Sequence, residues 1–354
     1  MTGTAPTEGP LTADELQLAT RNRGMPLEAL RYDVTPVGLH YLLVHFDIPA
    51  LDTSAWRLAI DGLVERPLEL SLAELQAMPT RTLTVTMECA GNGRARLMPR
   101  PISQPWLVEA IGTAEWTGVP LRDVLAPTGV QRVATELVFT GADHGVQAEV
   151  EQDYQRSLSV ADATRPEVLL AWAMNGRPLE PQHGAPLRLL VPGWYGMTSV
   201  KWLTRIEAVA RPFEGYQQAV AYHYQRDADD PGEPTTRIRV RALMIPPGHP
   251  DFMTRRRFVA AGPVELRGRA WSGEAPVVRV DVGIDSDWRA AQLDAPAGDF
   301  AWRGWRTMWD APPGEHVLAC RATDAAGNSQ PLEQPWNYQG MGNNLVQTVD
   351  VTVR

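Results

Sequence analysis

The sequence predicts an α+β domain followed by an all-β antiparallel sandwich. The chain has 354 residues, which suits two domains of about 100–200 residues each. Mixed helix and strand patterns fill its first two thirds, and short strands at regular spacing fill the rest. A polar stretch, DADDPGEPTT, separates the two regions. We therefore expect an extended, proline-punctuated lead-in at residues 1–35, an α+β domain at 36–226, a linker at 227–236 and a sandwich at 237–354.

The α+β domain is predicted to begin with a strand, a turn and a short helix. WRLAIDGLV at residues 56–64 is typical of a strand, and Arg66-Pro67 marks a turn. Within LELSLAELQAM at 68–78, Ser71 and Glu74 form a capping box, which predicts a helix beginning after Ser71. TLTVTMECA at 82–90 alternates and is β-branched, so it predicts a strand that ends at Cys89 before a turn at GNG.

Further strands complete the α+β domain. VPLRDVLAPTGV at residues 119–130 predicts a short helix ended by proline and glycine. ELVFTGADHG at 136–145 predicts a strand that breaks at a loop, and VLLAWAMNGRPL at 168–179 predicts an apolar strand entering an Asn-Gly hairpin turn. Residues 186–210 predict two strands around a glycine-rich loop.

The predicted sandwich rests on five alternating segments with Gly, Pro and Asp between them: IRVRALMI, PVELRGRAWS, PVVRVDVGID, HVLACRATDAAGN and LVQTVDVTV. Trp302, Trp305 and Trp309 are expected in the sandwich core and a subunit interface rather than on a docking surface. Cys320 lies on an alternating strand and is expected to be buried and inert.

Composition excludes several classes of function. The net charge of −9 and the pI near 5.4 argue against a nucleic-acid surface. No stretch approaches the ~20 consecutive apolar residues of a membrane span, and the polar N-terminus has no signal-peptide pattern, so we expect a cytoplasmic protein. The two cysteines, Cys89 and Cys320, form neither a disulfide framework nor a zinc, iron–sulfur or c-type haem motif.

The segment MECAGNGRARLMPR at residues 87–100 contains the strongest candidate for a reactive or metal-binding residue, Cys89. A lone cysteine at a strand end is most often a small buried residue, but Cys89 could also be a nucleophile with a histidine base or a thiolate ligand of a metal. The glycine turn and the neighbouring Arg94 and Arg96 favour a thiolate that faces an anionic group.

Four ordered motifs resemble the sulfite oxidase family. CAGNGR at residues 89–94 is similar to the family's cysteine signature, and Pro105-Trp106 with EAIGTAEWTGVPLRDVL is similar to the segment that follows its active-site tryptophan. Residues 169–203 resemble the family's cofactor-binding stretch, and residues 320–340 resemble its C-terminal domain. The resemblance covers roughly residues 40–350 and implies a molybdopterin-binding α+β domain followed by an immunoglobulin-like dimerisation domain.

The resemblance implies a molybdenum–molybdopterin cofactor with Cys89 as its protein ligand. It implies no haem, because the lead-in is far too short for a haem domain. The residues at family cofactor positions are His45, Cys89, Asp143, His183, Arg188, Ser199, Val200 and Lys201. Those implied in catalysis are Cys89, Arg94 beside an anionic substrate, Tyr154 as the active-site phenol and Trp106 as a wall that limits water. Arg156 lies nearby without an assignment.

The sequence departs from the family pattern at three places. Leu43 stands where the family has a substrate-binding arginine, Gly93 replaces the first arginine of the cysteine motif, and Gln339 stands where relatives carry another arginine. Such an anion site binds sulfite more weakly, recruits other arginines or serves a different substrate.

The leading hypothesis is the oxidation of sulfite to sulfate by oxygen-atom transfer, with electrons passed to a separate acceptor, a cytochrome or dioxygen. A homodimer through the C-terminal domain is implied. A reductase of sulfoxides or nitrate is the alternative within the same fold. A non-catalytic binding or assembly protein is the alternative of another class, and a cysteine hydrolase is less favoured, because only Cys89 itself recommends it.

Overall fold

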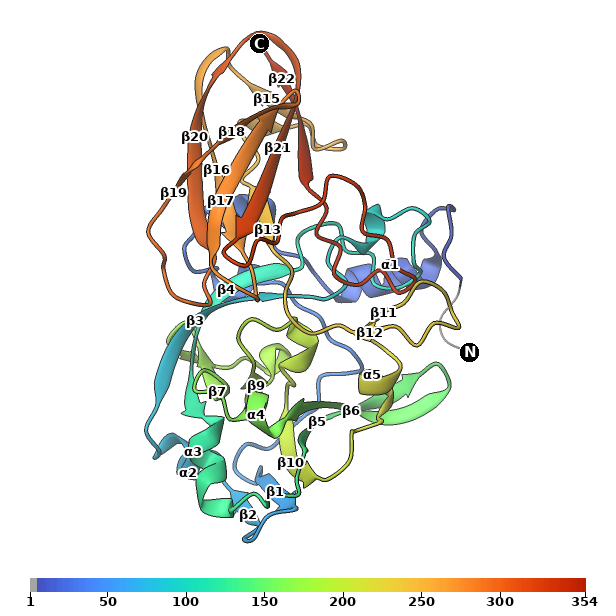
Figure 1. Ribbon diagram of the computed structural model, residues 1–354, viewed down its shortest axis with the longest axis vertical. Helices are drawn as coiled ribbons and strands as arrows, with labels where there is room; N and C mark the ends of the chain where they lie inside the picture. The colour runs from blue at the N-terminus through green and yellow to red at the C-terminus, as the bar shows by residue number, and fades with distance from the viewer. Residues whose placement is uncertain (1–4) are drawn as a thin grey trace.

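Two β-rich units stacked along the long axis make up the computed structural model of the chain, of which residues 5–354 are described (Figure 1). The N-terminal unit holds two sheets and all the α-helices, and the C-terminal unit is built from strands. No helix in residues 5–354 is long and apolar enough to cross a membrane. The α-helices are α1 (Ala13–Arg21), α2 (Leu72–Gln76), α3 (Leu121–Leu125), α4 (Val160–Ala163) and α5 (Tyr216–Ala219).

Two five-stranded sheets organise the N-terminal unit. The first has the order β2-β1-β10-β5-β6, in which only the β1–β10 pair is parallel. The second has the order β3-β4-β7-β8, with β9 pairing with β7. The strand bounds are β1 (Leu58–Gly62), β2 (Leu68–Leu70), β3 (Arg81–Glu88), β4 (Ile111–Pro120), β5 (Glu136–Gln147), β6 (Val150–Ser159), β7 (Leu169–Met174), β8 (Arg177–Pro178), β9 (Arg188–Leu190) and β10 (Leu203–Val209).

Most predicted elements of this unit are confirmed. The Ser71–Glu74 capping box precedes α2 with both of its hydrogen bonds formed. Strand β3 ends at Glu88 and so delivers Cys89 into the following turn. The Asn175-Gly176 turn joins β7 to β8, and both residues have a positive φ (51° and 72°), as a type I′ hairpin turn requires.

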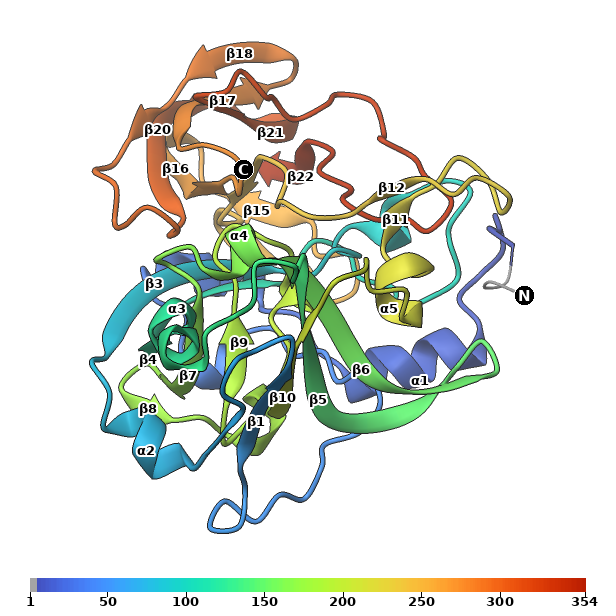
Figure 2. The same cartoon turned by 60° about the horizontal axis from the view of Figure 1, so that its bottom comes forward.

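Two predictions about this unit are wrong. The lead-in is not extended, because α1 begins after Thr12, whose side chain forms a capping box with Glu15, a pattern that the composition of the segment obscured. The segment at 136–145 does not break into a loop. Strand β5 continues to Gln147 past a register shift and turns into β6 at Ala148 and Glu149, giving the long hairpin seen in Figure 2.

The C-terminal unit is the predicted sandwich. Its sheets have the orders β13-β16-β20-β19 and β14-β15-β22-β21-β17-β18. Trp305, Trp309 and Cys320 are buried in its core, whereas Trp302 packs against Trp271 where the two units meet. The strands are β13 (Arg241–Met244), β14 (His249–Pro250), β15 (Arg257–Val259), β16 (Gly262–Trp271), β17 (Val277–Ile284), β18 (Asp287–Ala290), β19 (Gln292–Leu293), β20 (Arg303–Ala311), β21 (Gly314–Asp324) and β22 (Gln347–Val353).

The connection between the units is partly ordered structure. Residues expected to form a plain linker contribute β12 (Glu233–Pro234), which pairs with β11 (His223–Tyr224). A shared hydrophobic cluster joins this region, the N-terminal segment and the sandwich, and it includes Met25, Leu30, Tyr222, Ile238 and Trp271. The two units therefore pack through a common core, which fixes the elements around Cys89.

Candidate active site

Cys89 lies at the point where two cavities meet. Its backbone N–H donates to the Ala110 carbonyl (3.0 Å), and its carbonyl accepts from the Asn92 N–H (3.0 Å), so the turn after β3 holds the thiol in place. Burial raises the pKa of the Cys89 thiol, while the Gly91 N–H, the Arg94 guanidinium and the Trp106 indole oppose this shift. A positive group brought to the thiol would therefore favour the thiolate.

A buried ion pair anchors the cysteine turn from behind. The Glu88 carboxylate accepts from the Trp271 indole (2.7 Å) and the Asn92 amide (3.0 Å), and Arg241 Nε lies 3.2 Å from Glu88 Oε1. Arg241 and Trp271 belong to the sandwich, so the residue next to Cys89 is fixed by the other unit. Only 1% of Glu88 is exposed.

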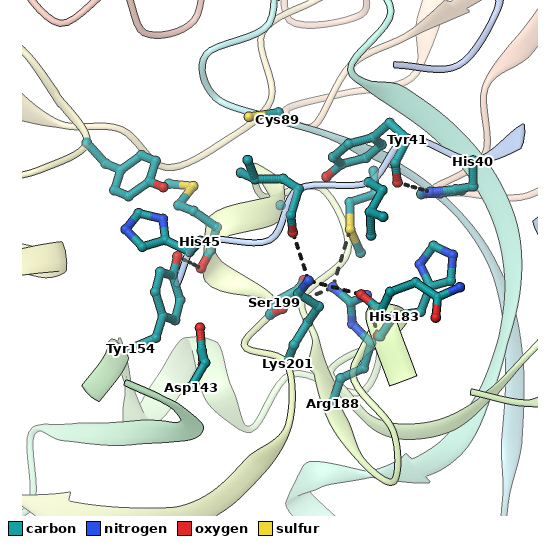
Figure 3. Close-up of a pocket in the computed structure, with 17 residues that line it drawn as sticks. His40, Tyr41, His45, Cys89, Asp143, Tyr154, His183, Arg188, Ser199 and Lys201 are labelled. Carbon is teal, nitrogen blue, oxygen red and sulfur yellow. Dashed lines mark hydrogen bonds between the residues drawn. The ribbon is translucent and has the colours of Figure 1, made fainter. Parts of the chain in front are cut away.

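The first cavity has an empty volume of about 650 Å³, its open mouth included, and lies below Cys89 in Figure 3. Cys89 lies on one side of it, and Asp143, Lys201 and Arg188 lie on the other (Figure 3). The predicted residues that it brings together are His45, Cys89, Asp143, Tyr154, His183, Arg188, Ser199 and Lys201.

Two buried cations line this cavity without a carboxylate partner among residues 5–354. Arg188 donates to the carbonyls of His183 and Ser199 (both 3.0 Å) and stacks on Trp116, 4.9 Å from the ring centre. The Lys201 ammonium donates to the carbonyls of Leu43 (2.8 Å) and Gln182 (3.1 Å). Burial lowers the pKa of Arg188 to about 10 and that of Lys201 to about 7. Buried charges of this kind indicate a site for an anionic group.

Four polar atoms on the cavity wall have no partner in the described chain: Nε2 of His40, Nε2 of His183, Nε of Arg188 and Oδ1 of Asp143. Burial raises the pKa of Asp143 to about 6 and lowers that of His183 to about 3. Buried polar groups are normally hydrogen-bonded, so these atoms require a ligand that offers both donors and acceptors. A phosphate-bearing pterin meets this requirement, and the Cys89 thiol at the cavity edge is a suitable soft metal ligand.

Histidines on the same wall are neutral. Burial lowers the pKa values of His40 and His45 to about 4. His45 Nε2 lies 2.7 Å from Oε1 of Gln147, and His40 Nδ1 lies 3.0 Å from the Tyr41 carbonyl. These residues can act as hydrogen-bond partners of a ligand without adding charge.

The second cavity lies on the other side of Cys89 and has an empty volume of about 1970 Å³, its open mouth included. It contains the predicted residues Arg94 and Trp106. Four residues line both cavities and so form their junction: Leu43, His45, Cys89 and Tyr222.

Arg94 is held in the second cavity by neutral acceptors alone. Its Nε donates to the Gln339 carbonyl (3.0 Å), one terminal nitrogen reaches the Gln104 carbonyl (3.5 Å) and the other contacts Met341 Sδ (3.3 Å). Its exposed fraction is 5%, and it has no carboxylate partner in residues 5–354. Arg94 thus offers a buried positive charge beside Cys89.

Gln339 does not present its side chain to the cavity as a free polar group. Its Oε1 accepts from the N–H of Tyr222 (2.9 Å), and its Nε2 donates to the Val220 carbonyl (3.0 Å) and to Gln225 Oε1. Tyr222 has a positive φ of 61°, which costs energy for a residue with a side chain. Gln339 therefore holds a strained turn in the position where relatives are expected to carry an arginine.

The two phenols near the junction differ in placement. Tyr154 faces the first cavity, where its hydroxyl donates to the Met197 carbonyl (2.8 Å). Tyr222 lines both cavities, and the Arg156 guanidinium lies 5.5 Å from its ring centre. Arg156, unassigned from the sequence, thus supports Tyr222. The assignment of Tyr154 as the active-site phenol stays a prediction, and Tyr222 is a second candidate.

One predicted cofactor residue does not reach either cavity. The Val200 side chain packs in the core of the first sheet, and its backbone N–H and carbonyl bond to Thr198 and Leu189. Conversely, sequence reasoning missed His40, Tyr41 and Tyr222, which line the cavities. His40 and Tyr41 stand just before His45 in an irregular segment, where no periodic pattern singles out a residue.

Comparisons with known proteins agree with this arrangement. The family of oxidoreductase molybdopterin binding domains matches residues 45–217, and that of Mo-co oxidoreductase dimerisation domains matches residues 233–354. The chain is 34% identical over 352 residues to the mitochondrial sulfite oxidase of Macaca fascicularis, covering 90% of this chain and 62% of that protein. It is 32% identical to the NAD(P)H nitrate reductase of Hordeum vulgare, covering 90% of this chain but 39% of that protein. The chain therefore spans less than two thirds of these relatives.

Among solved structures, the sulfane dehydrogenase SoxCD from Paracoccus pantotrophus matches with a TM-score of 0.81 and 27% identity. The match covers 98% of this chain and 93% of that one.

Proposed function

The chain belongs to the sulfite oxidase family of molybdopterin-dependent oxidoreductases, and on this premise we propose that it oxidises sulfite to sulfate. The observation that carries the proposal is Arg94, a buried guanidinium without a carboxylate partner in residues 5–354, in the cavity that Cys89 borders. The reaction combines sulfite with water and yields sulfate, two protons and two electrons. The electrons leave to a separate acceptor, a cytochrome or dioxygen.

The first cavity is proposed to hold the molybdenum–molybdopterin cofactor. Cys89 would bind the metal, and Arg188 and Lys201 would bind the pterin phosphate with their unpaired positive charges. His183 and Asp143 would bind pterin nitrogen and oxygen atoms with the polar atoms that lack partners. When bound, the cofactor supplies a two-electron centre that exchanges an oxygen atom with the substrate.

On the substrate side, Arg94 would bind a sulfite oxygen, and the Trp106 indole would exclude water from the space next to Cys89. The hydroxyls of Tyr222 and Tyr154 are protonated at neutral pH, because burial raises the pKa of Tyr222 to about 12 and that of Tyr154 well above its ordinary value. Tyr222 can therefore donate a hydrogen bond at the junction, whereas the Tyr154 hydroxyl donates to the Met197 carbonyl on the side of the first cavity. His45 is neutral there and leaves Arg94 as the buried charge of the substrate side.

The test is sulfite-dependent reduction of ferricyanide by molybdenum-replete protein, with Cys89→Ser as the matched variant. Serine replaces a soft thiolate with a poorly ionised oxygen, so we expect turnover to be lost while the circular dichroism spectrum stays the same. A metal-loaded protein that gives no turnover with sulfite would overturn the proposal. Nitrate and sulfoxide reduction by a reduced dye would then be measured, since the barley relative is a nitrate reductase.

We also propose a homodimer formed through residues 237–354, all of which lie within the match to the dimerisation-domain family at residues 233–354. Sedimentation of the cofactor-loaded protein would show twice the mass of the chain, and a monomer at micromolar concentration would contradict this.

A further inference from the structure

The second cavity is far larger and less charged than a sulfite site needs. The space in it that water-sized spheres can occupy is about 780 Å³, against about 70 Å³ in the first cavity. Pockets of several hundred Å³ hold organic ligands, whereas sulfite has only four heavy atoms. The cavity therefore has room for a substituent that sulfite does not possess.

The charge of the lining fits a monoanion. Arg94 is the buried guanidinium of this cavity. Arg21 is exposed at the edge of the cavity, and its guanidinium donates to the carbonyls of Val44, His45 and Phe46. Asp47 adds a negative charge at the rim. His144, also on the rim, is paired with two carboxylates, those of Asp153 (2.7 Å) and Glu151 (3.1 Å).

Neutral side chains stand at the two positions where an arginine was expected. Leu43, at the junction with the first cavity, stands at one expected arginine position, and its carbonyl binds Lys201. Gln339 stands at the other expected arginine position, and both polar atoms of its side chain form hydrogen bonds within the protein. A further part of the wall is apolar and aromatic and includes Phe46, Ile102, Trp106, Tyr216 and Val220.

We propose that the second cavity takes an organic sulfinate, R–SO₂⁻, whose head group lies between Cys89 and Arg94 and whose apolar R group lies along this wall. The inference rests on the proposed oxidation and extends its substrate class. A sulfinate keeps the sulfur lone pair of sulfite, but it carries one negative charge and an organic group in place of one oxygen. A neutral sulfoxide would leave the buried charge of Arg94 without a partner.

The reaction balances as the oxidation of sulfite does. The sulfinate and water give a sulfonate, R–SO₃⁻, two protons and two electrons. One S–O bond forms from the water oxygen, both O–H bonds of that water break, and sulfur is oxidised by two electrons. These electrons leave to the same separate acceptor, for which ferricyanide substitutes in the assay.

The first measurement is binding, which does not depend on turnover. Benzenesulfonate and methanesulfonate, which cannot be oxidised further, are titrated calorimetrically into the cofactor-loaded protein. We expect benzenesulfonate to bind at least tenfold more tightly, because its ring buries apolar surface. Ile102→Asp, on the cavity wall, should reduce this preference at least fivefold, whereas Leu107→Asp, an exposed and non-lining position on the same loop, should leave it unchanged.

The second measurement is ferricyanide reduction with benzenesulfinate, methanesulfinate and sulfite. We expect kcat/KM for benzenesulfinate to exceed that for methanesulfinate at least tenfold, and Leu43→Arg to shift the preference toward sulfite. Turnover with sulfite alone, together with equal binding of the two sulfonates, would overturn the inference and leave the proposed function intact. If the protein turns over none of the three substrates but still binds benzenesulfonate in a way that depends on Ile102, the proposed function is overturned. The proposed binding site for an organic sulfonate or sulfinate is then supported.

Discussion

The Glu88–Arg241 pair should control both the stability of the chain and the position of Cys89. In Glu88→Gln the carboxylate is removed, and the amide that replaces it has one acceptor oxygen for two donors, the Trp271 indole N–H and the Asn92 amide. The change therefore removes the charge and one of these two hydrogen bonds. Arg241, of which 3% of the side chain is exposed, is left without its anionic partner.

The size of the effect follows from this burial. Removing one partner of a buried ion pair costs about 3–5 kcal/mol, because the remaining charge stays in a medium of low polarity. Arg241 Nε lies 3.2 Å from Glu88 Oε1 but is not well aligned for a hydrogen bond. The attraction between the two opposite charges is therefore the main part of their interaction. Because one donor also loses its acceptor, the expected loss lies near the upper end, at about 5 kcal/mol.

Urea unfolding followed by tryptophan fluorescence would measure the loss, and the molybdenum content of the purified protein would report on the site. We expect Glu88→Gln to unfold at lower urea and to hold less metal. Arg241→Met added to it should restore about half of the lost stability or more, since the uncompensated charge is gone. The reasoning is refuted if the unfolding free energy of Glu88→Gln lies within about 1 kcal/mol of that of the parent protein. It is also refuted if adding Arg241→Met lowers the unfolding free energy further.

Three further predictions concern the walls of the two cavities. Gln339→Leu leaves the Tyr222 N–H and the Val220 carbonyl without partners, so kcat/KM should fall about tenfold or more at unchanged metal content, and an unaltered kcat/KM would count against the positioning of Tyr222. Arg188→Met removes a buried charge, so the cofactor-free protein should melt no lower than the parent yet retain little pterin; a lowered melting temperature would contradict this. Burial raises the pKa of Asp143 from 3.8 to about 6, so the folded cofactor-free chain binds a proton more tightly than the unfolded chain, and its unfolding free energy should fall as pH rises between these values. Asp143→Asn should remove up to about 3 kcal/mol of that fall, and urea unfolding from pH 4 to 6 would show an unchanged slope if the argument is wrong.

Local patterns predicted the elements whose signals lie within a few residues. The capping box at Ser71, the Asn175-Gly176 turn and the alternating strand before Cys89 all have short-range causes, and all are confirmed. The capping box at Thr12 has the same cause, but it was masked by the surrounding Pro, Gly and Thr, and α1 was missed. The end of β5 was misplaced because Gly145 suggests a break, whereas pairing with β6 carries the strand through it.

The cavity walls could be predicted only where a motif marked them. Cys89, Arg188 and Lys201 lie in segments that resemble the family, and the structure places all three on the first cavity. Tyr222 lies outside the segments in which a family motif was recognised. It reaches the junction because a left-handed backbone conformation turns it there and because Gln339, far away in the sequence, holds that turn. A contact between residues more than a hundred positions apart leaves no trace in either local segment.

The same contacts give the C-terminal unit a function beyond association. Arg94 is held by the carbonyl of Gln339 and the sulfur of Met341, and Glu88, the neighbour of Cys89, is held by Arg241 and Trp271. Both Cys89 and Arg94 are thus positioned by residues of the C-terminal unit. A change at Met341 alters the contacts of Arg94, which lines the second cavity and not the first. Under the proposed function, the C-terminal unit would therefore help to set the substrate preference, and Gln339 is an example: its amide closes the turn at Tyr222 and adds no positive charge to the second cavity.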